Sequence, residues 1–340
     1  MRFLTFSRQY PHWLFPGRGD RDEVSGSTVT VEAEPVLDGV NPLTWWRAAR
    51  IVRTTAPDLL LVQWSVSYWG PMLWLLVRRP SSRTRTVMVC HNAAPHERPH
   101  PLAERLTRLV QWLVMRHVDH LVCHSDSDRV ALEALVPEVR VHRVVMPTYE
   151  DLAMIRPASE GSSAGRPQLL FFGFVRPYKG VDVLLRAMPE VVAALPEARL
   201  VIAGEWWSSA DGTRRLLTEE VRAHVEIRDR YVSNEEMAGL FRTADVVVLP
   251  YRSATQSAVV QLAFGFGVPV ITTRVGGLPD IVSDERNGLL VPPEDPGALA
   301  SAIVRYHREG WRARLAPAVA EARERFSWQS LVDTLERLVE

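Results

Sequence analysis

The sequence has few cysteines and no long apolar run. Cys90 and Cys123 are its only cysteines, which excludes a framework of disulfide bridges and is typical of a reduced, cytosolic protein. No apolar run approaches the ~18 residues of a membrane-spanning helix, and the longest one, residues 71–77, predicts a buried helix. Residues 1–6 lack the features of a signal peptide. We therefore expect a cytoplasmic protein, or one held peripherally on the inner face of the membrane.

The sequence also lacks an excess of either charge, and it is nearly devoid of lysine. Lys and Arg together number 40, as do Asp and Glu, so no global basic field favours nucleic acid as a partner. Lys179 is the one lysine in the chain. Two interpretations of it stay open: chance, or a place where a compact ammonium is wanted instead of a guanidinium.

What the sequence does contain is an ordinary globular mixture, with 46% hydrophobic and 24% charged residues, in a chain long enough for two domains. In the first half, short β-branched runs alternate with longer helical patterns, which predicts βαβ units and a parallel sheet. The predicted strands are 2–6, 29–31, 59–63, 86–90, 120–124 and 141–145, and the predicted helices are 42–55, 71–78, 101–117 and 128–135.

A segment rich in Ser, Gly, Ala and Pro, residues 156–167, interrupts this alternation and predicts a linker. We therefore expect two tandem Rossmann-like, doubly wound α/β domains, 1–155 and 168–325, with a C-terminal helix, 326–340, packing back on the first. The strands predicted after the linker are 168–172, 199–203, 225–227, 246–249, 269–272 and 288–291, and the helices are 181–194, 234–242, 257–266, 296–308, 311–324 and 327–340.

The first loop of the second half carries two cations. Gly173 closes a strand, and Arg176 and Lys179 lie three residues apart just before a helix start. A helix N-terminus favours anions, and a guanidinium with an ammonium placed there suits a diphosphate. The alternative is a solvated basic turn.

Two further loops follow buried strands. In one, Gln256, Ser257 and Ala258 stand at a helix start, where free backbone N–H groups hold phosphate or where polar side chains merely cap the helix. In the other, Gly276 and Gly277 permit a close approach of ligand, or form a simple turn. Because ligands bind beyond the carboxyl ends of the strands in such sheets, these loops are the candidate binding site.

The order and spacing of these loops resemble the retaining glycosyltransferases of family four, which have two Rossmann-like domains facing a central cleft, the GT-B fold. The resemblance covers almost all of residues 168–305, and VCHNAAPHE at 89–97 is similar to a segment found in a subset of these enzymes. The matching segments of the second half are FGFVRPYKGVDVLL, VIAGE, YVSNEEMAGLFRTADVVVLPY, AVVQLAFGFGVPVITTRVGGLPDIV and NGLLVPPEDPGALASAI.

The resemblance implies that a sugar is moved from a nucleoside-diphosphate sugar to a hydroxyl acceptor with retention, and that no metal or other cofactor is required. Arg176 and Lys179 would hold the donor diphosphate and stabilise the departing nucleoside diphosphate. Glu205 would lie near the nucleoside, and His91 would face the sugar. The other implied site residues are Gly173, Gln256, Ser257 and Ala258 at the diphosphate, Tyr231 and Val232 at the nucleoside, and Asn92, Gln261, Gly276 and Gly277.

The chain departs from the family in two places. Where the family commonly has a pair of glutamates, Ala254 and Leu262 stand, and Gln256 or Gln261 would replace them only by hydrogen bonding. A first βα unit of ~30 residues also has no counterpart. Its loss would leave an unpaired sheet edge, so a start placed too late is favoured over natural loss.

The weaker signals have ordinary alternatives. Asp126 and Asp128 resemble a metal-binding DxD motif, but their place between a strand and a helix favours capping, and the histidines lack a zinc pattern, so no metal is expected. An arginine-rich stretch with Trp74 and Trp112 is either a patch that docks on anionic membrane or a solvated face over core tryptophans. Its arginines are Arg78, Arg79, Arg83, Arg85, Arg98, Arg105, Arg108 and Arg116.

Two functions follow from these patterns. The first is a retaining hexosyltransferase that acts on a hydroxyl of a saccharide or of a lipid-linked acceptor. The second is a pseudo-glycosyltransferase that binds a sugar nucleotide and scaffolds or regulates a partner, which the missing glutamates and the missing βα unit favour. A third and weaker alternative is a related epimerase acting on the nucleotide sugar itself. The sequence does not specify the base, the sugar, the acceptor or the oligomeric state.

Overall fold

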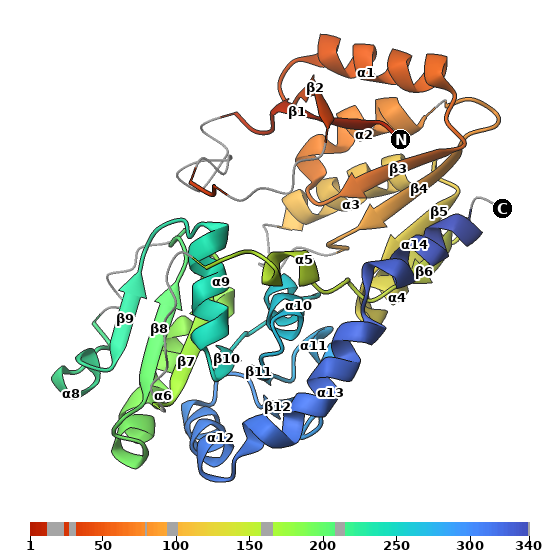
Figure 1. The fold of residues 1–340 in the computed structure, drawn as a ribbon. Helices are drawn as coiled ribbons and strands as arrows, with labels where there is room; N and C mark the ends of the chain where they lie inside the picture. The colour runs from red at the N-terminus through yellow and green to blue at the C-terminus, as the bar shows by residue number, and fades with distance from the viewer. Residues whose placement is uncertain are drawn as a thin grey trace. The chain divides into compact units, whose positions relative to one another are not determined.

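The computed structural model describes residues 1–11, 24–26, 32–78, 80–93, 101–157, 166–207 and 215–338. The chain divides into two compact units (Figure 1). Each is an α/β structure of parallel strands, so the two tandem Rossmann-like domains predicted from the alternating pattern are confirmed. The N-terminal unit comprises Met1–Arg21, Val29–Val145 and Gln329–Glu340, and the C-terminal unit comprises Asp22–Thr28 and Met146–Trp328.

The N-terminal unit contains two parallel sheets. In the described residues, β1 pairs with β2 alone, and β3 to β6 form a separate sheet in chain order. One edge of β1 and one edge of β3 therefore have no partner strand in this part of the chain. The strand expected at 29–31 lies outside the described residues. The six strands are β1 (Phe3–Arg8), β2 (Ala33–Asp38), β3 (Leu59–Trp64), β4 (Arg85–Cys90), β5 (His120–Cys123) and β6 (Arg140–Arg143).

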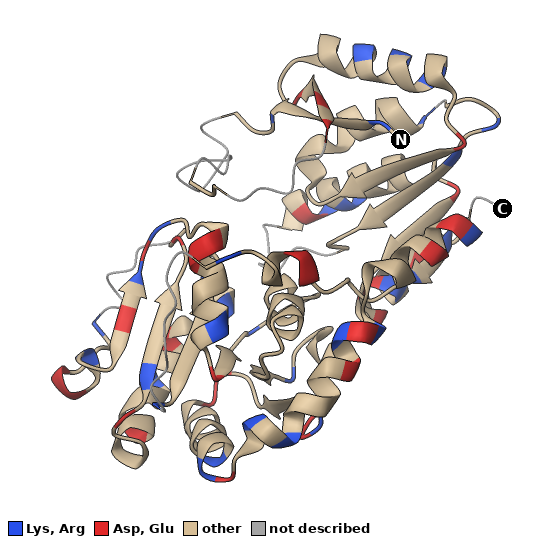
Figure 2. Ribbon diagram, viewed as in Figure 1, with Lys and Arg blue, Asp and Glu red and all other residues tan. Residues whose placement is uncertain are grey.

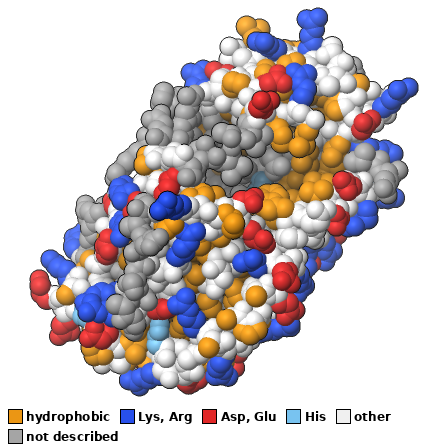
Figure 3. Space-filling view, viewed as in Figure 1, with side chains coloured by type: hydrophobic (Ala, Val, Ile, Leu, Met, Phe, Trp, Pro, Cys, Tyr) orange, Lys and Arg blue, Asp and Glu red, His pale blue; other side chains and the backbone are white. Residues whose placement is uncertain are grey.

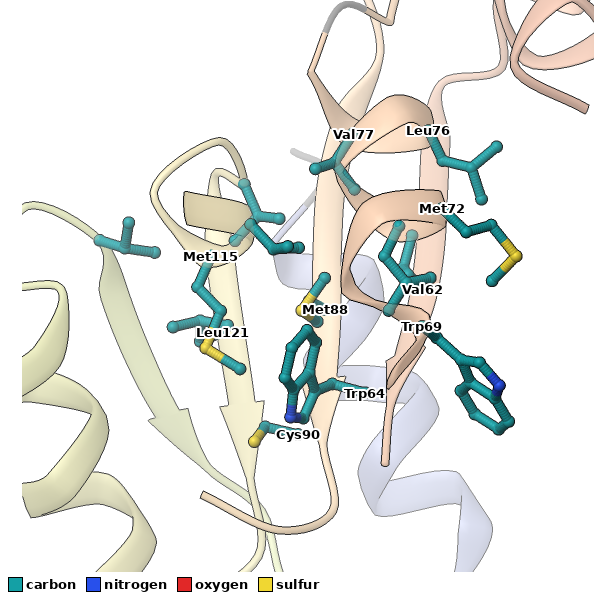
Figure 4. Packing of buried hydrophobic residues seen from close by; sticks show 14 of the residues in the cluster. Val62, Trp64, Trp69, Met72, Leu76, Val77, Met88, Cys90, Met115 and Leu121 are labelled. Atoms are coloured by element: carbon teal, nitrogen blue, oxygen red, sulfur yellow. The ribbon is translucent and has the colours of Figure 1, made fainter. Parts of the chain in front are cut away.

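Helices cover one face of both sheets and bury a single apolar core against it. Trp64, Met88 and Leu121 from the strands pack with Met72 and Met115 from the helices (Figure 4). Each such side chain contributes about 1.5–3 kcal/mol when it is fully buried, so this layer is fixed firmly. The helices are α1 (Pro42–Thr55), η1 (Ser67–Trp69), α2 (Gly70–Val77), α3 (Pro101–Met115) and α4 (Asp126–Leu135).

The C-terminal helix α14 (Trp328–Arg337) packs on the other face of the four-stranded sheet. Leu331 is buried against Val89 and Val122, and Leu335 lies beside them. The two faces of this sheet are therefore covered by different parts of the chain, α1 to α4 on one side and α14 on the other (Figure 1).

Side-chain caps define several helix starts. Asn41 accepts a hydrogen bond from the N–H of Leu43 at the start of α1, as N-cap residues do. Ser233 accepts one from the N–H of Glu236 and so caps the helix that begins at Asn234. The Glu236 carboxylate forms ion pairs with two arginines of the preceding strand and loop, Arg228 and Arg230.

The C-terminal unit has one six-stranded parallel sheet in the order β12-β11-β10-β7-β8-β9. The chain leaves β7 in one direction along the sheet and returns to the other side of it at β10, so the carboxyl ends of β7 and β10 flank a switch point, where such sheets bind ligands. The strands are β7 (Gln168–Phe172), β8 (Arg199–Ala203), β9 (Val225–Arg228), β10 (Val246–Leu249), β11 (Val270–Thr273) and β12 (Gly288–Val291).

Helices and short turns complete the C-terminal unit, and they follow the strands in the predicted alternation. The longer helices agree with the predicted ones within a few residues, whereas most of the short ones were not predicted from the sequence. They are α5 (Glu150–Ala153), η2 (Pro177–Lys179), α6 (Val181–Ala194), α8 (Glu219–Arg222), α9 (Asn234–Thr243), α10 (Ala258–Gly265), α11 (Leu278–Ile281), α12 (Pro296–Arg308) and α13 (Trp311–Arg325).

Candidate functional site

The loop after β7 places an ammonium directly over a glycine. Gly173 has φ 104°, a backbone conformation that side chains disfavour. A Cβ on Gly173 would stand 3.2 Å from Lys179 Nζ and 3.5 Å from Val259 Cγ2. The glycine therefore makes room for the ammonium, and the structure brings together the end of β7, the end of η2 and the start of α10.

The side chain of Lys179 is partly buried. Burial lowers the pKa of its ammonium below the ordinary value, and the charge of Arg176 acts in the same direction. The ring of Tyr251 lies 5.5 Å from Nζ. Among the described residues, no carboxylate forms an ion pair with Lys179. A desolvated cation of this kind is stabilised by an anion that comes from outside the protein.

Arg176 lies beside two aromatic rings, one from its own loop and one from the loop after β8. Its guanidinium is 5.5 Å from the Tyr178 ring and 5.4 Å from the Trp207 ring, and Trp207 also packs on Phe174 with 4.5 Å between ring centroids. Such cation–π contacts orient a guanidinium without neutralising it. The sequence indicated the two cations but not this aromatic cluster, because Trp207 follows a different strand.

A second arginine, which sequence reasoning missed, ties the loop after β10 to the loop after β7. Arg252 donates its backbone N–H to Tyr178 O (2.7 Å) and its Nη1 to Pro177 O (2.7 Å). It also pairs with both oxygens of Asp182 at 2.8 Å. Burial alone would raise the Asp182 pKa, but the hydrogen bonds and charge of Arg252 hold it below its usual value. The η2 turn is therefore held from two sides.

The start of α10 is the third part of this site. Ser257 is buried and its hydroxyl accepts a hydrogen bond from the N–H of Val260 at 3.4 Å. Capping is therefore confirmed for Ser257, and capping leaves the first amides of the helix, beginning with Ala258, without intrahelical acceptors. Gln256 lies partly buried just before the cap. Oriented N–H groups at a helix start suit phosphate oxygens.

The loop after β11 supports this site from behind. Gly276 has φ 49°, and a Cβ there would overlap the Ala254 carbonyl oxygen. Gly277 donates its N–H to that same oxygen at 3.3 Å. Gly276 and Gly277 thus let two loops pack in contact, and Ala254, where the sequence comparison expects the first glutamate, is buried.

The residue at the expected position of the second glutamate is also apolar and buried. Leu262 is 6% exposed and its neighbour Gln261 is 0% exposed. In the described part of the chain, neither Nε2 nor Oε1 of Gln261 has a hydrogen-bond partner. A buried amide without partners costs about 1–3 kcal/mol, so Gln261 is a candidate for contact with a ligand or a bound water.

The expected nucleoside residues lie at the ends of β8 and β9. Gly204, at the end of β8, has φ 144°, and a Cβ there would meet the Gly173 carbonyl oxygen. Glu205 is buried, and its backbone carbonyl accepts from the N–H of Val175 at 2.9 Å. Tyr231 is 38% exposed and Val232 is buried. Glu205 is therefore adjacent to the β7 loop.

In the N-terminal unit, His91 follows β4 and is held by a glutamine of β3. Its Nε2 lies 2.6 Å from Gln63 Oε1, so that nitrogen carries the hydrogen. Burial, and then the neighbouring His124, lower the pKa of His91 to about 4. The imidazole is therefore neutral at neutral pH, with Nδ1 as its acceptor atom.

The backbone after His91 is held by a hydrogen bond to the start of α4. Asn92 is partly buried, and Ala93 donates its N–H to Asp128 Oδ1 at 3.2 Å. Asp128 in turn accepts from the Ser125 hydroxyl at 2.8 Å, and Ser125 is the N-cap of α4. Capping of α4 at this DxD-like motif is thus confirmed. Among the described residues, no cluster of three metal-ligating side chains is present.

Two family models match the chain, one in each half. The model described as glycosyl transferases group 1 matches residues 166–309, and that of Glycosyltransferase Family 4 matches residues 11–146. The chain is similar to proteins named D-inositol 3-phosphate glycosyltransferase. That of Saccharomonospora viridis is 33% identical over 294 residues, or 79% of this chain and 67% of the relative. That of Segniliparus rotundus is 32% identical over 289 residues, or 79% and 63%.

Solved structures share the fold. Sucrose-phosphate synthase from Thermosynechococcus elongatus has a TM-score of 0.67 at 22% identity, over 87% of this chain and 77% of that one. The Anabaena protein HepE, solved in complex with UDP, has a TM-score of 0.67 at 18% identity. The match covers 91% of this chain and 86% of HepE. These structures show that the chain has the GT-B fold. The two family models and the Saccharomonospora viridis relative show that it belongs to glycosyltransferase family 4.

Proposed function

We propose that the protein transfers a sugar from a nucleoside-diphosphate sugar to a hydroxyl acceptor with retention of configuration. One observation carries the proposal: the Lys179 ammonium is partly buried over Gly173, beside the start of α10, without a carboxylate partner in the described residues. A diphosphate placed there would supply the missing negative charge. It would also accept hydrogen bonds from the first α10 amides.

The chemistry follows from where charge develops. When the glycosidic bond to the donor phosphate breaks, negative charge grows on the departing diphosphate, and Lys179 and Arg176 would stabilise it there. The stabilisation is greater in the transition state than in the bound donor, so it lowers the barrier. In this proposal no step needs a metal, and activity in the presence of a chelator tests that part of it.

The nucleoside would lie along the ends of β8 and β9. Glu205 would accept from the ribose hydroxyls, and the Tyr231–Val232 segment would border the base. HepE was solved with UDP, which makes UDP the first probe to try. The relatives are named for D-inositol 3-phosphate, which makes that molecule the first acceptor to try. A hydroxyl of a saccharide or of a lipid-linked molecule is the broader acceptor class.

The sugar side of the site would depend on neutral groups. His91 would present its Nδ1 lone pair to a sugar hydroxyl, with Asn92 next to it. Gln256 and Gln261 would provide hydrogen bonds where the family commonly has carboxylates, because Ala254 and Leu262 offer none.

Those two apolar positions also support a second candidate function. A pseudo-glycosyltransferase would keep the diphosphate site and lack catalysis, and would act on a partner protein instead. Calorimetry with nucleoside diphosphates and a donor-hydrolysis assay with UDP-, GDP- and ADP-sugars separate the two functions. Release of the nucleoside diphosphate supports the enzyme. Binding without release from any donor, with acceptor present, refutes it.

A further inference from the structure

We propose that the outer surface of helices α1, α2 and α3 docks on an anionic lipid bilayer. The docking itself does not need the donor site. Its consequence, that the acceptor hydroxyl is presented from the membrane, rests on the proposed transferase function. No described helix is long and apolar enough to cross a membrane, so the contact would be peripheral.

The first observation is a stripe of leucines on the outside of α3. Four leucines recur at intervals of four, three and four residues and so share one helix face; between 40% and 67% of each is exposed. The buried residues of the helix, Gln111, Val114 and Met115, lie on the opposite face. When one face of a helix is buried in the core and the opposite face is also apolar, the outer face indicates a contact with another molecule or a membrane. The stripe consists of Leu102, Leu106, Leu109 and Leu113.

Helix α1 repeats the arrangement. Leu43 and Trp46 are 77% and 57% exposed, while the buried residues are Ala48, Ala49 and Val52. Both α1 and α3 pack against α2 and cover the same side of the sheets. Their exposed sides therefore belong to the outer surface of one helical layer, and Figure 3 shows orange side chains at the surface of this unit among blue ones.

The second observation is the charge of the layer. The three helices and the residues that end α2 and α3 carry seven arginines and one acidic residue, Glu104. Figure 2 shows blue and no red along α1. Among the described residues, no ion pair is formed by any of the seven, whereas the arginines of β9 and of the loop after β10 are paired. The seven are Arg47, Arg50, Arg53, Arg78, Arg105, Arg108 and Arg116.

Two of these arginines lie over tryptophan rings of the same helical layer. The Arg78 guanidinium lies 4.3 Å from the Trp74 ring, and that of Arg116 lies 4.4 Å from the Trp112 ring. Exposed leucines with arginine and tryptophan around them are the composition of a helix lying in the membrane interface.

Charge and hydrophobicity together select the partner. A second copy of the chain would bring these seven arginines against the same seven, which like-charge repulsion opposes. A nucleic acid would satisfy the arginines but leave the leucine stripe in water. An anionic bilayer satisfies both, since its headgroups attract the arginines and its acyl boundary takes the leucines.

The test is flotation of the full chain with vesicles of phosphatidylglycerol and phosphatidylcholine, and with phosphatidylcholine alone. We expect the wild-type chain to float only with the anionic vesicles. The Leu106→Glu/Leu109→Glu and Arg105→Glu/Arg108→Glu variants should each lower the partition coefficient at least about tenfold. Val332→Glu on α14, which covers the opposite face of the sheet, is the matched control and should float like wild type.

Three results would overturn the proposal: no flotation with either vesicle, equal flotation with both, or unchanged flotation of the two α3 variants. A wild-type dimer that the leucine variants dissociate would assign the stripe to a second copy instead. Lys179→Ala separates this proposal from the proposed function, because it should float like wild type while it loses donor binding.

Discussion

Replacing Lys179 by methionine should weaken donor binding and stabilise the donor-free protein at the same time. The methionine keeps most of the length of the side chain beside Gly173 and removes the charge. A charge-assisted hydrogen bond to phosphate contributes about 1.5–3 kcal/mol, so Kd should rise about 10- to 150-fold. The apo protein should melt at a higher temperature, because the ammonium is partly desolvated and no described carboxylate pairs with it.

The lowered pKa of Lys179 also predicts the direction in which stability and donor affinity change with pH. Since the pKa of Lys179 is lowered in the folded state, its protonation costs stability below that pKa. This cost disappears as the pH rises past the ordinary value for lysine. A bound diphosphate would favour the protonated form, so donor affinity should fall as the pH rises through the lowered pKa, and Lys179→Met should abolish that fall.

Calorimetry with UDP and differential scanning of the donor-free chain measure both effects. Lys179→Arg is the matched control, because it keeps the charge while changing its shape, and it should bind more tightly than Lys179→Met. A methionine variant with wild-type affinity would refute the diphosphate site. One with lower affinity and a lower melting temperature would instead show that Lys179 holds the loop together.

Three other substitutions test parts of the site separately. Gly173→Ala should cost about 1–3 kcal/mol of stability through its positive φ and also raise Kd, as denaturant titration and calorimetry would show; unchanged values would contradict the close approach. Arg252→Met should destabilise by about 1–3 kcal/mol, and its effect should shrink as the pH falls through the lowered pKa of Asp182, in contrast to a purely steric defect. Gln63→Leu should lower kcat and leave the donor Kd unchanged if it positions the neutral imidazole of His91, and a matching change in Kd would argue against that role.

Much of the diphosphate site could be predicted from the sequence because its signals are local. Gly173, Arg176 and Lys179 lie within one loop, next to a strand pattern and a helix pattern. The sequence could not predict that Arg252 holds that loop in place, because its partners Asp182 and Glu294 are 70 and 42 residues away. Such pairs depend on which strands become neighbours, and a propensity pattern does not contain that information.

The leucine stripe of α3 shows a different limit. Helical spacing of apolar residues predicts a buried face, and α3 has apolar residues on two faces. The sequence alone does not tell which face contacts the sheet. Only packing of Val114 and Met115 against the core identifies the leucines as the outer face.

Whether a cation has a partner is what distinguishes the proposed functional cations from the structural ones. Arg252 and Arg228 hold carboxylates at hydrogen-bond distance, and these carboxylates neutralise the charge of the two arginines within the fold. Lys179 and the arginines of the α1–α3 surface have no such partner in the described residues, and a protein retains desolvated or clustered positive charge at a cost in stability. The cost is offset when a diphosphate or an anionic headgroup binds. In the sequence both kinds are simply basic residues, so the distinction has to come from the partners that the fold brings to them.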